Sequence, residues 1–271
     1  MSAAIAGISV SAIVGNLRVD RCPRLVLVSE RHIPLSRGSM DLPDPDGALF
    51  GTIAVGQEAK ITFGYRGAAP AAWSGQVASV SRGPRRDQVT VRMQGLAELP
   101  LVATPVTESW VDQSSESILR RVAVQVGLSV ARLDSPGVVF PRFMAASLSL
   151  WQVARQASHT VQRANGMDMS AWALWLGADG LHWGDHDEPG DLPVIATGKG
   201  LIRHDPAVRG AGAWSEVETF LLPGFGHSRR FVLEDERRGI SGDYRGQRVR
   251  HEVLPDRART IIAYGEDHGR Y

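Results

Sequence analysis

The clearest pattern in the chain is an alternation of apolar and polar residues between Val55 and Leu99. Three runs carry it, at residues 59–63, 76–80 and 88–93, and turns rich in glycine and proline separate them. Successive side chains of a half-buried strand point to opposite faces, so each run predicts a strand with one face in a core. Strand, turn, strand, turn, strand at this spacing predicts an antiparallel meander within a small barrel or sandwich.

Strand patterns also precede this meander. Residues 8–13 alternate, and residues 17–33 contain the apolar run Leu25-Val26-Leu27-Val28, which is typical of a strand buried on both faces. Residues 34–51 hold prolines and an Asp-Gly pair, and these predict a loop without regular structure.

Three carboxylates of this loop, Asp41, Asp44 and Asp46, raise the possibility of a calcium site. A calcium-binding loop places a glutamate about six residues after its glycine. The next acid after Gly47 is Glu58, so the spacing does not fit. We interpret the three carboxylates as part of a solvated turn.

Two helices are predicted beyond residue 102. The first has an N-cap at Ser114 and Glu116 in its first turn, and it ends at Gly127. The second spans residues 148–164 after a cap at Ser147, and Asn165-Gly166 closes it. Each has one apolar stripe: Ile118, Leu119, Val122, Ala123 and Val126 in the first, and Leu150, Val153, Ala154, Ala157 and Val161 in the second.

A β-hairpin is predicted at residues 171–184, because aromatic and aliphatic residues flank the Asp179-Gly180 turn. Three of the seven tryptophans lie in it, Trp172, Trp175 and Trp183. A tryptophan ribbon can bind sugar rings or bases. Packing beneath the two helices is the more usual role, and it is the one we expect here.

Strand patterns return after an acidic loop at residues 185–191. They lie at residues 216–222, 230–233, 250–254 and 260–264, and the last two are expected to pair across residues 255–257. Residues 246–262 echo residues 75–91: each begins Gly-Gln, turns through charged residues and leads to a glycine, Gly265 or Gly95. This echo fits two similar β modules.

The predicted fold is therefore α+β and mainly β. Two small antiparallel β-barrel-like domains, at residues 1–102 and 191–271, flank an α+β middle domain at residues 103–190 that holds the two helices and the Trp-rich hairpin.

Composition narrows the classes of function that the chain can have. The chain has 271 residues, of which 43% are hydrophobic and 22% charged, and a formal net charge of +1. A near-neutral chain gives no bulk electrostatic argument for binding nucleic acid or an anionic membrane. Only Lys60 and Lys199 are lysine; arginine suits bidentate contacts at interfaces, although a GC-rich genome produces the same bias.

Two further classes are excluded: proteins held by disulfides or cysteine-bound zinc, and proteins inserted in a membrane through the apolar N-terminal residues. Cys22 is alone, so the chain holds no internal disulfide and no cysteine-based zinc site. Residues 3–14 are apolar but too short to cross a bilayer, so no membrane insertion is expected.

The best candidate for metal chemistry is the pair His182 and His186 with nearby carboxylates. Histidine and carboxylate are suitable ligands for zinc or iron. The two histidines lie at a strand end that runs into a Pro-Gly loop, so the helical spacing that aligns two imidazoles is absent. The carboxylates are Asp185, Asp187 and Glu188, and His204 with Asp205 would join them only through a tertiary contact.

Catalytic motifs are not found. Residues 224–228 read Gly-Phe-Gly-His-Ser, which is not a nucleophile elbow, and Lys199 lacks the glycine framework of a phosphate-binding loop. Glu108 and Asp112 are the nearest analogue of the paired carboxylates of a glycosidase, and we interpret them as structural acids near a helix N-terminus. No catalytic, cofactor-binding or metal-binding residue is assigned.

Four groups of motifs follow one another from about Leu17 onward. They are Gly56-Gln57 through Gly64-Tyr65 with Trp73 to Val77 and Val89-Thr90-Val91; Ser109-Trp110-Val111-Asp112 with Ile118-Leu119, Val122-Ala123 and Gly127-Leu128; the ribbon from Trp172 to Trp183; and Val249, His251, Arg259, Thr260 and Ile262. In this order they resemble the phage tail hub proteins of the late-control-gene-D and baseplate-hub group. Residues 148–157 lack the acidic entry and the phenylalanine of the corresponding helix in many relatives, so the chain resembles a divergent member.

The resemblance implies a structural virion protein in the tail baseplate. It would be a homotrimeric hub that joins the tail tube to a central spike or fibre and forms part of the DNA-passage channel, with two barrel-like domains per subunit making six around the axis. Implied partners are the tail tube or distal tail protein, the spike or fibre, the tape measure protein, and passing DNA without sequence-specific binding. No enzymatic activity is implied.

Three alternatives stay open at this point. The chain could be a tail-tip peptidoglycan hydrolase, a carbohydrate-binding tail module, or a hub of a phage-derived secretion or gene-transfer particle.

Overall fold

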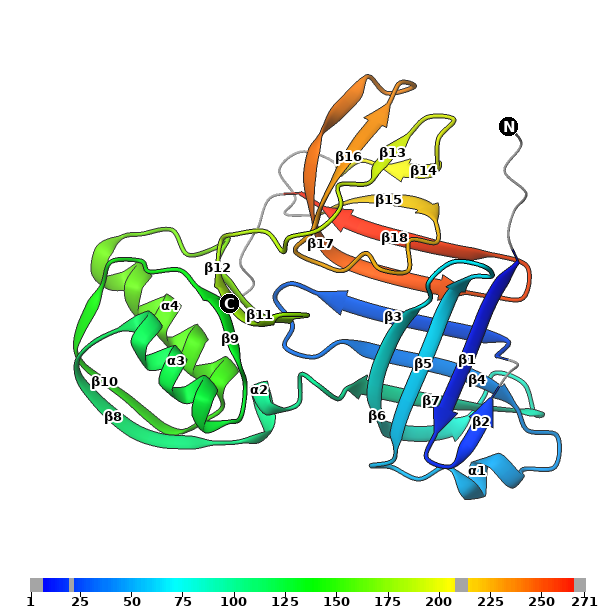
Figure 1. Cartoon of the computed structure of the whole chain (residues 1–271), viewed down its shortest axis with the longest axis horizontal. Helices are drawn as coiled ribbons and strands as arrows, with labels where there is room; N and C mark the ends of the chain where they lie inside the picture. Colours follow the sequence, from blue (N-terminus) through cyan, green and yellow to red (C-terminus); the bar gives the residue numbers. More distant parts are fainter. Residues whose placement is uncertain (1–6, 20–21, 208–213, 266–271) are drawn as a thin grey trace.

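The computed structural model describes residues 7–19, 22–207 and 214–265, and most of its regular structure is one large sheet (Figure 1). The sheet runs in the order β14-β15-β18-β17-β3-β4-β7-β6-β5-β1-β2, and β13 and β16 join it through β17. Its strands are β1 (Ile8–Val14), β2 (Leu17–Val19), β3 (Arg24–Glu30), β4 (Arg37–Pro43), β5 (Glu58–Tyr65), β6 (Ala71–Arg82), β7 (Gln88–Gly95), β13 (Val194–Ala196), β14 (Leu201–Asp205), β15 (Ser215–Phe220), β16 (Arg230–Asp235), β17 (Ile240–Val253) and β18 (Ala258–Tyr264).

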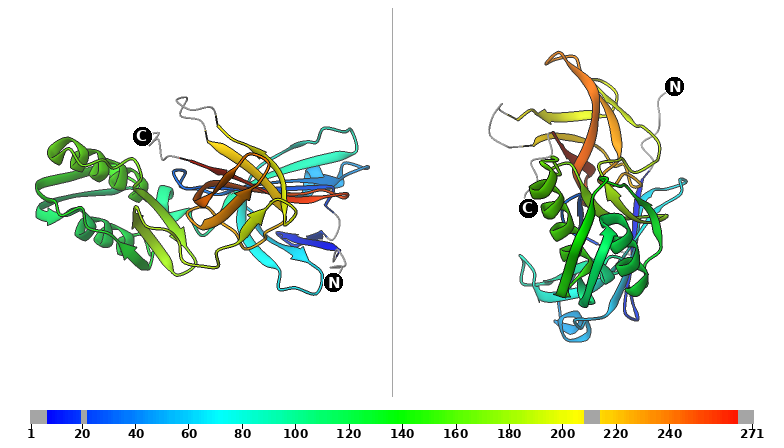
Figure 2. Two further views of the ribbon diagram at one scale, coloured as in Figure 1. Left: turned by 90° about the horizontal axis from the view of Figure 1, so that it is seen from above. Right: turned by 90° about the vertical axis from the view of Figure 1, so that its left-hand side faces the viewer.

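The middle of the chain forms a separate lobe beside this sheet (Figures 1 and 2). A two-stranded ribbon, β8 (Val106–Ser114) with β10 (Val139–Leu148), packs against the helices α3 (Ser115–Gln125) and α4 (Leu150–Asn165). A three-stranded sheet completes the lobe, in the order β11 (Ala173–Gly177), β12 (Gly180–Gly184) and β9 (Val130–Leu133). Of two short helices, α1 (Ala48–Thr52) packs beside the large sheet, and α2 (Pro100–Ala103) packs against the middle lobe through Leu101.

Buried hydrophobic side chains gather in three clusters. One belongs to the middle lobe and runs from Leu101 to Trp183. A second lies mainly between β1 and β7 and includes Ile61, and a third lies between β13 and β18 and includes Ile262. The second cluster also includes Leu221, Val253 and Ala258 from the last part of the chain, and the three domains with their boundaries stay a prediction.

Among the described strands, the two β-rich regions pair with each other along one seam. Strand β3 pairs antiparallel with β17 over the register Leu25↔Val253 to Glu30↔Arg248. On its other side β3 pairs with β4, so β3 is an interior strand of one continuous sheet. The α+β, mainly β class is confirmed, and in the described residues neither β region is a closed barrel.

The predicted meander and its echo are both hairpins of this sheet. Strands β5, β6 and β7 pair antiparallel in sequence order, as expected. The pair β17–β18 forms the echo, and each hairpin has a register shift within three residues of its glycine, at Val77/Ser79 and at Gly246/Arg248. A bulge bends its strand and increases the local twist, so both hairpins bend near their Gly-Gln, although at positions two residues apart in the echo.

The prediction of an irregular loop at residues 34–51 was wrong. Strand β4 lies there, paired on one side with β3 and on the other with β7, and α1 follows it. Asp44 and Asp41 are buried rather than solvated, at 6% and 5% exposure. The Asp44 carboxylate accepts from the backbone N–H groups of Leu49 and Phe50 in α1, and Asp41 accepts from the Thr90 hydroxyl.

Both predicted helices are present, and one start is corrected. Helix α3 has Ser114 as N-cap and is followed by Gly127 at φ 81°, as predicted. Helix α4 begins at Leu150 with Ser149 as its cap, two residues after the predicted Ser147. Ser149 and Gln152 form a reciprocal capping box, which satisfies two helix-end donors at once and therefore sets the boundary.

Candidate functional site

The contacts between the middle lobe and the sheet centre on Arg31, which follows the end of β3. Its side chain is fully buried, and its guanidinium donates to the backbone oxygens of Gly184 (2.9 Å) and Ala171 (3.1 Å) and to Ser228 Oγ (2.8 Å). The three acceptors come from the hairpin, the segment before it and the loop before β16. One planar cation with five donors therefore links all three regions of the chain.

Beside Arg31 lies a row of four polar side chains, here called the His relay: Asp179, His182, His186 and Asp134. His182 Nε2 lies 2.7 Å from Asp179 Oδ1, His182 Nδ1 lies 3.1 Å from His186 Nε2, and His186 Nδ1 lies 2.7 Å from Asp134 Oδ2. The Trp175 ring stacks on His182 with centroids 5.0 Å apart, and the Arg31 guanidinium carbon lies 4.5 Å from the Trp175 ring centroid.

Burial and hydrogen bonding shift the pKa values in this row. Burial lowers the pKa of His186, although the Asp134 carboxylate opposes that shift. Burial alone would raise the pKa of Asp134, but hydrogen bonds from His186 and Arg132 outweigh it and lower it. The hydrogen bond from His182 lowers the pKa of Asp179, so both carboxylates are held in their charged form.

The structure brings together only some of the residues of the metal site considered in the sequence. His182 and His186 do meet, but Asp185 and Asp187 bind Arg245 instead. Glu188 forms no part of the row, and burial raises its pKa. Within the described ranges no group of three or more histidine, cysteine, aspartate or glutamate side chains is arranged to hold a metal ion.

Sequence reasoning missed both carboxylates of the His relay. Asp179 precedes His182 by three residues across the hairpin turn, so the register of the hairpin could have indicated it. Asp134 lies just after β9, which pairs in parallel with β12. A short parallel strand joined to its partner from far along the chain leaves no local signal.

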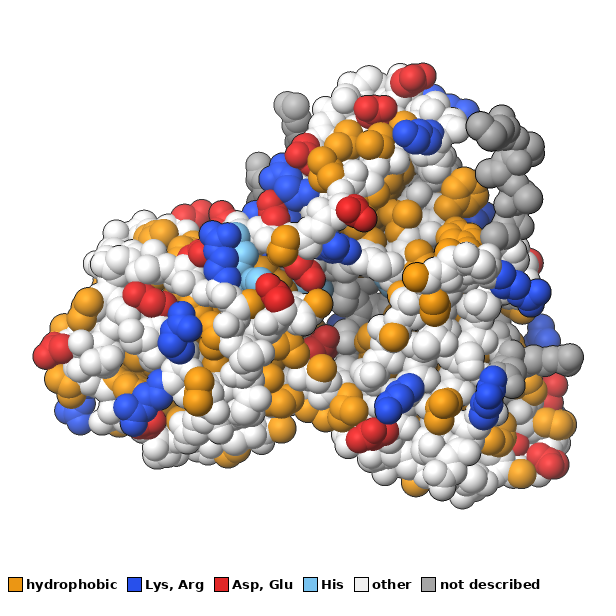
Figure 3. Space-filling view, viewed as in Figure 1, with side chains coloured by type: hydrophobic (Ala, Val, Ile, Leu, Met, Phe, Trp, Pro, Cys, Tyr) orange, Lys and Arg blue, Asp and Glu red, His pale blue; other side chains and the backbone are white. Residues whose placement is uncertain are grey.

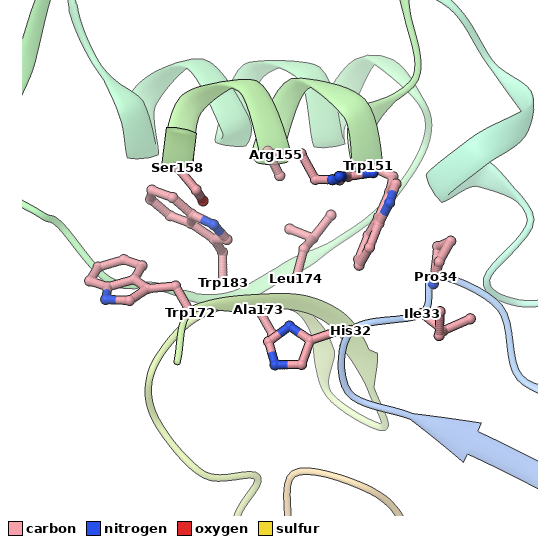
Figure 4. Close-up of a pocket in the computed structure, with 11 residues that line it drawn as sticks. His32, Ile33, Pro34, Trp151, Arg155, Ser158, Trp172, Ala173, Leu174 and Trp183 are labelled. Carbon is pink, nitrogen blue, oxygen red and sulfur yellow. The ribbon is translucent and has the colours of Figure 1, made fainter. Parts of the chain in front are cut away.

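The tryptophans of the hairpin pack inward, as expected. Trp172 and Trp183 are 8% and 1% exposed and meet edge to face at 4.8 Å, and both belong to the core of the middle lobe. A cavity of about 150 Å³ beside them lies between α4 and residues 32–34 of the β3–β4 turn (Figure 4). Figure 4 shows Trp151 and Leu174 directed toward this space as well. Buried rings of this kind do not form an open sugar platform.

The remaining sequence candidates have structural partners. His204 contacts Asp235 and the Tyr264 hydroxyl, each at 2.7 Å, while Asp205 pairs with Arg203. Ser228 is fully buried and accepts from Arg31.

The paired-carboxylate and phosphate-loop candidates are likewise not assembled into a site. Glu108 forms an ion pair with Arg121, and Asp112 is exposed. The Lys199 backbone N–H closes the turn between β13 and β14 by donating to Ala196 O.

The face of the large sheet opposite the second and third cores carries a run of ion pairs. Arg24 lies between Asp41 and Glu252, and Arg250 also binds Glu252. Further along, Arg248 pairs with Glu216 and Arg259 with Glu218. Positive and negative side chains are also interspersed on the face shown in Figure 3. These partners neutralise one another across β15, β18, β17, β3 and β4.

The main path of the large sheet ends in two edge strands, and a side branch ends in a third. Among the described residues β2 pairs only with β1, β14 only with β15, and β13, at the end of the branch, only with β16. Apolar side chains are exposed near the β2 and β14 edges, Ile13 at 46% and Ile202 at 40%. Helices in the part of the chain that the structure describes are too short or too polar to span a membrane.

Comparisons with known proteins give structural neighbours only. No protein-family model and no curated protein matches the sequence. A tail protein from Neisseria meningitidis MC58 is similar over 97% of this chain and 98% of its own, with a TM-score of 0.67 at 12% identity. The 43 kDa tail protein of prophage MuSo2 from Shewanella oneidensis covers 96% of this chain and 99% of its own, with a TM-score of 0.69 at 10% identity.

A third neighbour belongs to a secretion machine. The c3393 protein of E. coli is a component of the type VI secretion system and is described as similar in structure to the T4 bacteriophage tail proteins gp27 and gp5. It covers 95% of this chain and 78% of its own, with a TM-score of 0.59 at 11% identity. At these identities the similarity establishes the fold: this chain shares the fold of phage tail proteins and of a type VI secretion component.

Proposed function

We propose that the chain is a structural subunit of a phage tail or a related injection particle, and that it forms the trimeric hub between the tail tube and a central spike or fibre. The observation that carries the proposal is the single open sheet with its two echoing hairpins and with the edge strands β2 and β14 at the two ends of its main path. The whole-length similarity in fold to tail proteins supports it, because both chains are covered almost completely.

The free edges suggest how copies assemble. An unpaired strand edge exposes N–H and C=O groups that another chain can pair with. Since β2 and β14 lie at opposite ends of one sheet, the edge of one copy can meet the other edge of the next. Such a head-to-tail contact either closes into a ring or grows as a filament, and three copies with two β regions each would give a near-sixfold ring.

The ion-paired face suggests what such a ring encloses. Four of its arginines, Arg24, Arg248, Arg250 and Arg259, are paired with carboxylates on the same or neighbouring strands, which offsets much of the positive charge that could bind phosphates. A wall that attracted DNA strongly would hold it by counterion release. A self-neutralised wall suits passage without sequence-specific binding, and we assign this face to the channel.

Partners follow from the same proposal. The tail tube or distal tail protein would meet one side of the ring, and the spike or fibre protein the other. The tape measure protein would occupy the channel before DNA passes. No residue requires a catalytic role in this function.

Assembly is tested by light scattering and native mass spectrometry, followed by electron microscopy of the purified chain. We expect a trimer with a central opening. A lysine on an edge strand discourages pairing, so Ile202→Lys should weaken trimer formation at least tenfold. The matched control is Val55→Lys, because Val55 is 68% exposed and lies outside the strands.

The outcomes separate the alternatives. A monomer at high concentration with no ring in images would overturn the hub proposal. Equal trimer formation by both variants would exclude the β14 edge as the contact. Peptidoglycan hydrolysis that is lost in Glu108→Ala or His182→Ala would support a tail-tip hydrolase instead. An image of the native particle would distinguish a phage from a secretion or gene-transfer particle.

A further inference from the structure

The two imidazole rings of the His relay are buried and every ring nitrogen has a partner, while Asp179 at one end of the row is 57% exposed. The side chains of His182 and His186 are 3% and 7% exposed. The outer nitrogens face the carboxylates of Asp179 and Asp134, and the inner nitrogens face each other across 3.1 Å. Water therefore has little access to the contact between the two inner nitrogens, although it reaches the Asp179 carboxylate.

Counting hydrogens shows which charge of the pair fits these contacts. A carboxylate only accepts, and an imidazole nitrogen donates only when it carries a hydrogen. The two outer contacts need a hydrogen on each outer nitrogen, and the inner contact needs one hydrogen between the two inner nitrogens. Three hydrogens on four nitrogens is one more than two neutral rings carry and one fewer than two charged rings carry. All three contacts are hydrogen bonds at the same time only when the pair carries one imidazolium and one neutral imidazole.

The surrounding charges favour this state. Arg132 donates to Asp134 at 2.8 Å, and Arg31 donates to the His186 backbone oxygen at 3.3 Å. Glu188 is the further acid near His182. Two carboxylates thus stabilise one proton, while burial and the arginines disfavour a second.

The same pair is attached to the junction with the sheet. Arg31 holds the backbone oxygens of both Gly184 and His186, so the position of His186 sets the path of the chain as it leaves β12. Trp175 contacts Arg31, His182 and His186 together. A change in the hydrogen bond between His182 and His186 therefore alters the contacts that Arg31 makes with the chain after β12.

We propose that His182 and His186 form a one-proton switch that controls how firmly the middle lobe is attached to the sheet. With one shared proton all three hydrogen bonds form. A second proton turns the central contact into two opposed N–H groups, and loss of the shared proton leaves two opposed lone pairs. In either case His186 moves away from His182 and the Arg31 contacts loosen.

The pKa of His186 decides whether acid stabilises or destabilises the folded chain. Its pKa in the folded chain lies below the ordinary value of 6.5, so the unfolded chain binds the second proton first as the pH falls. On the acid side, the stability that this pair contributes is therefore present at pH 6.5 and is lost as the pH falls below it. One proton corresponds to at most a tenfold change in the folding equilibrium constant per pH unit.

The direct test is nuclear magnetic resonance of the imidazole nitrogens in the full-length wild-type chain. At neutral pH we expect protonated outer nitrogens and one further proton coupled to both inner nitrogens. Two neutral rings without coupling between them would overturn the proposal. Added zinc should leave the shared proton in place, and its replacement by zinc would overturn the switch in favour of a metal site.

The second test compares the pH dependence of unfolding by urea. His186→Gln keeps a polar group at the Nε2 position but cannot take a second proton, so its loss of stability from pH 6.5 to 5 should be smaller than that of wild type by up to tenfold per pH unit. His159→Gln, on the exposed side of α4, should retain the wild-type slope. Equal slopes for wild type and His186→Gln would refute the switch, and the wild-type spectra decide the matter if that variant does not fold.

Discussion

Arg31 is a buried cation whose described hydrogen bonds go to oxygens that carry no formal charge. Its Nη1 and Nη2 groups donate to carbonyl and hydroxyl groups from three regions of the chain. Removing the side chain would leave those acceptors buried and unpaired, which costs about 1–3 kcal/mol for each group that finds no new partner. A single residue therefore supports much of the junction.

Arg31→Met should lower the free energy of unfolding by about 3 kcal/mol or more, because it deletes the donors while keeping an unbranched side chain. Arg31→Lys should also destabilise, since an ammonium cannot replace the planar fork. Urea unfolding measures both. The control is Arg121→Ala, whose side chain is 65% exposed and whose loss should cost under about 1 kcal/mol. A cost for Arg31→Met as small as that of the control would contradict the role given to Arg31.

Cys22 illustrates how burial alters reactivity. Burial is the main cause that raises the pKa of its thiol to about 12 from an ordinary value of 9.0. The folded chain then has about 1,000-fold less thiolate than a free thiol, and the thiolate is the reactive form. Alkylation at pH 8 should be slow in the native chain and fast in urea. Equal rates in the two conditions would show that Cys22 is not shielded.

At the scale of the element, features that depend on neighbouring residues could be predicted from the sequence, and features that depend on distant segments could not. The caps and apolar stripes of α3 and α4 are local, so both helices were predicted to within two residues. Strand β4 was missed because its prolines and Asp-Gly end indicate a loop, and only pairing with β3 and β7 makes it a strand. In the same way His182 and His186 were found, but Asp134 was not.

The start of α4 gives a test at this scale. Ser149→Ala should destabilise the chain by about 1 kcal/mol, because Ser149 caps the helix. Ser147 has a positive φ of 57°, a conformation that glycine adopts without strain, so Ser147→Gly should be neutral or slightly stabilising. Thermal unfolding of both variants is the measurement. A larger loss for Ser147→Gly than for Ser149→Ala would restore the cap predicted from the sequence.

For the whole molecule, the decisive contact is the β3–β17 seam. The sequence indicated two similar β regions, and the structure joins them through six residue pairs in a single sheet. No local sequence pattern predicts that β3 pairs with β17, since the apolar run at residues 25–28 fits any interior strand. The second core even includes Val253 and Ala258 from the far region.

The seam predicts that the two β regions unfold together. Ile61→Ala in the second core and Val249→Ala in the third should each destabilise by about 2–4 kcal/mol. Both should speed hydrogen exchange in β5 and in β18 alike, and mass spectrometry can measure each strand separately. Faster exchange confined to the mutated region would show that the regions open independently.

The pairing of β3 with β17 also sets the order in which parts of the chain can fold during synthesis. The core of the middle lobe uses residues from one stretch of the chain, so it can form as soon as that stretch leaves the ribosome. Strand β3 is made early and β17 late, so the Leu25-Val26-Leu27-Val28 segment waits with one edge unpaired until translation is nearly finished. Contacts between distant segments form slowly, and an apolar edge that waits is prone to aggregate. The newborn chain is therefore most vulnerable before β17 emerges, and a chaperone that covers β3 would raise its yield.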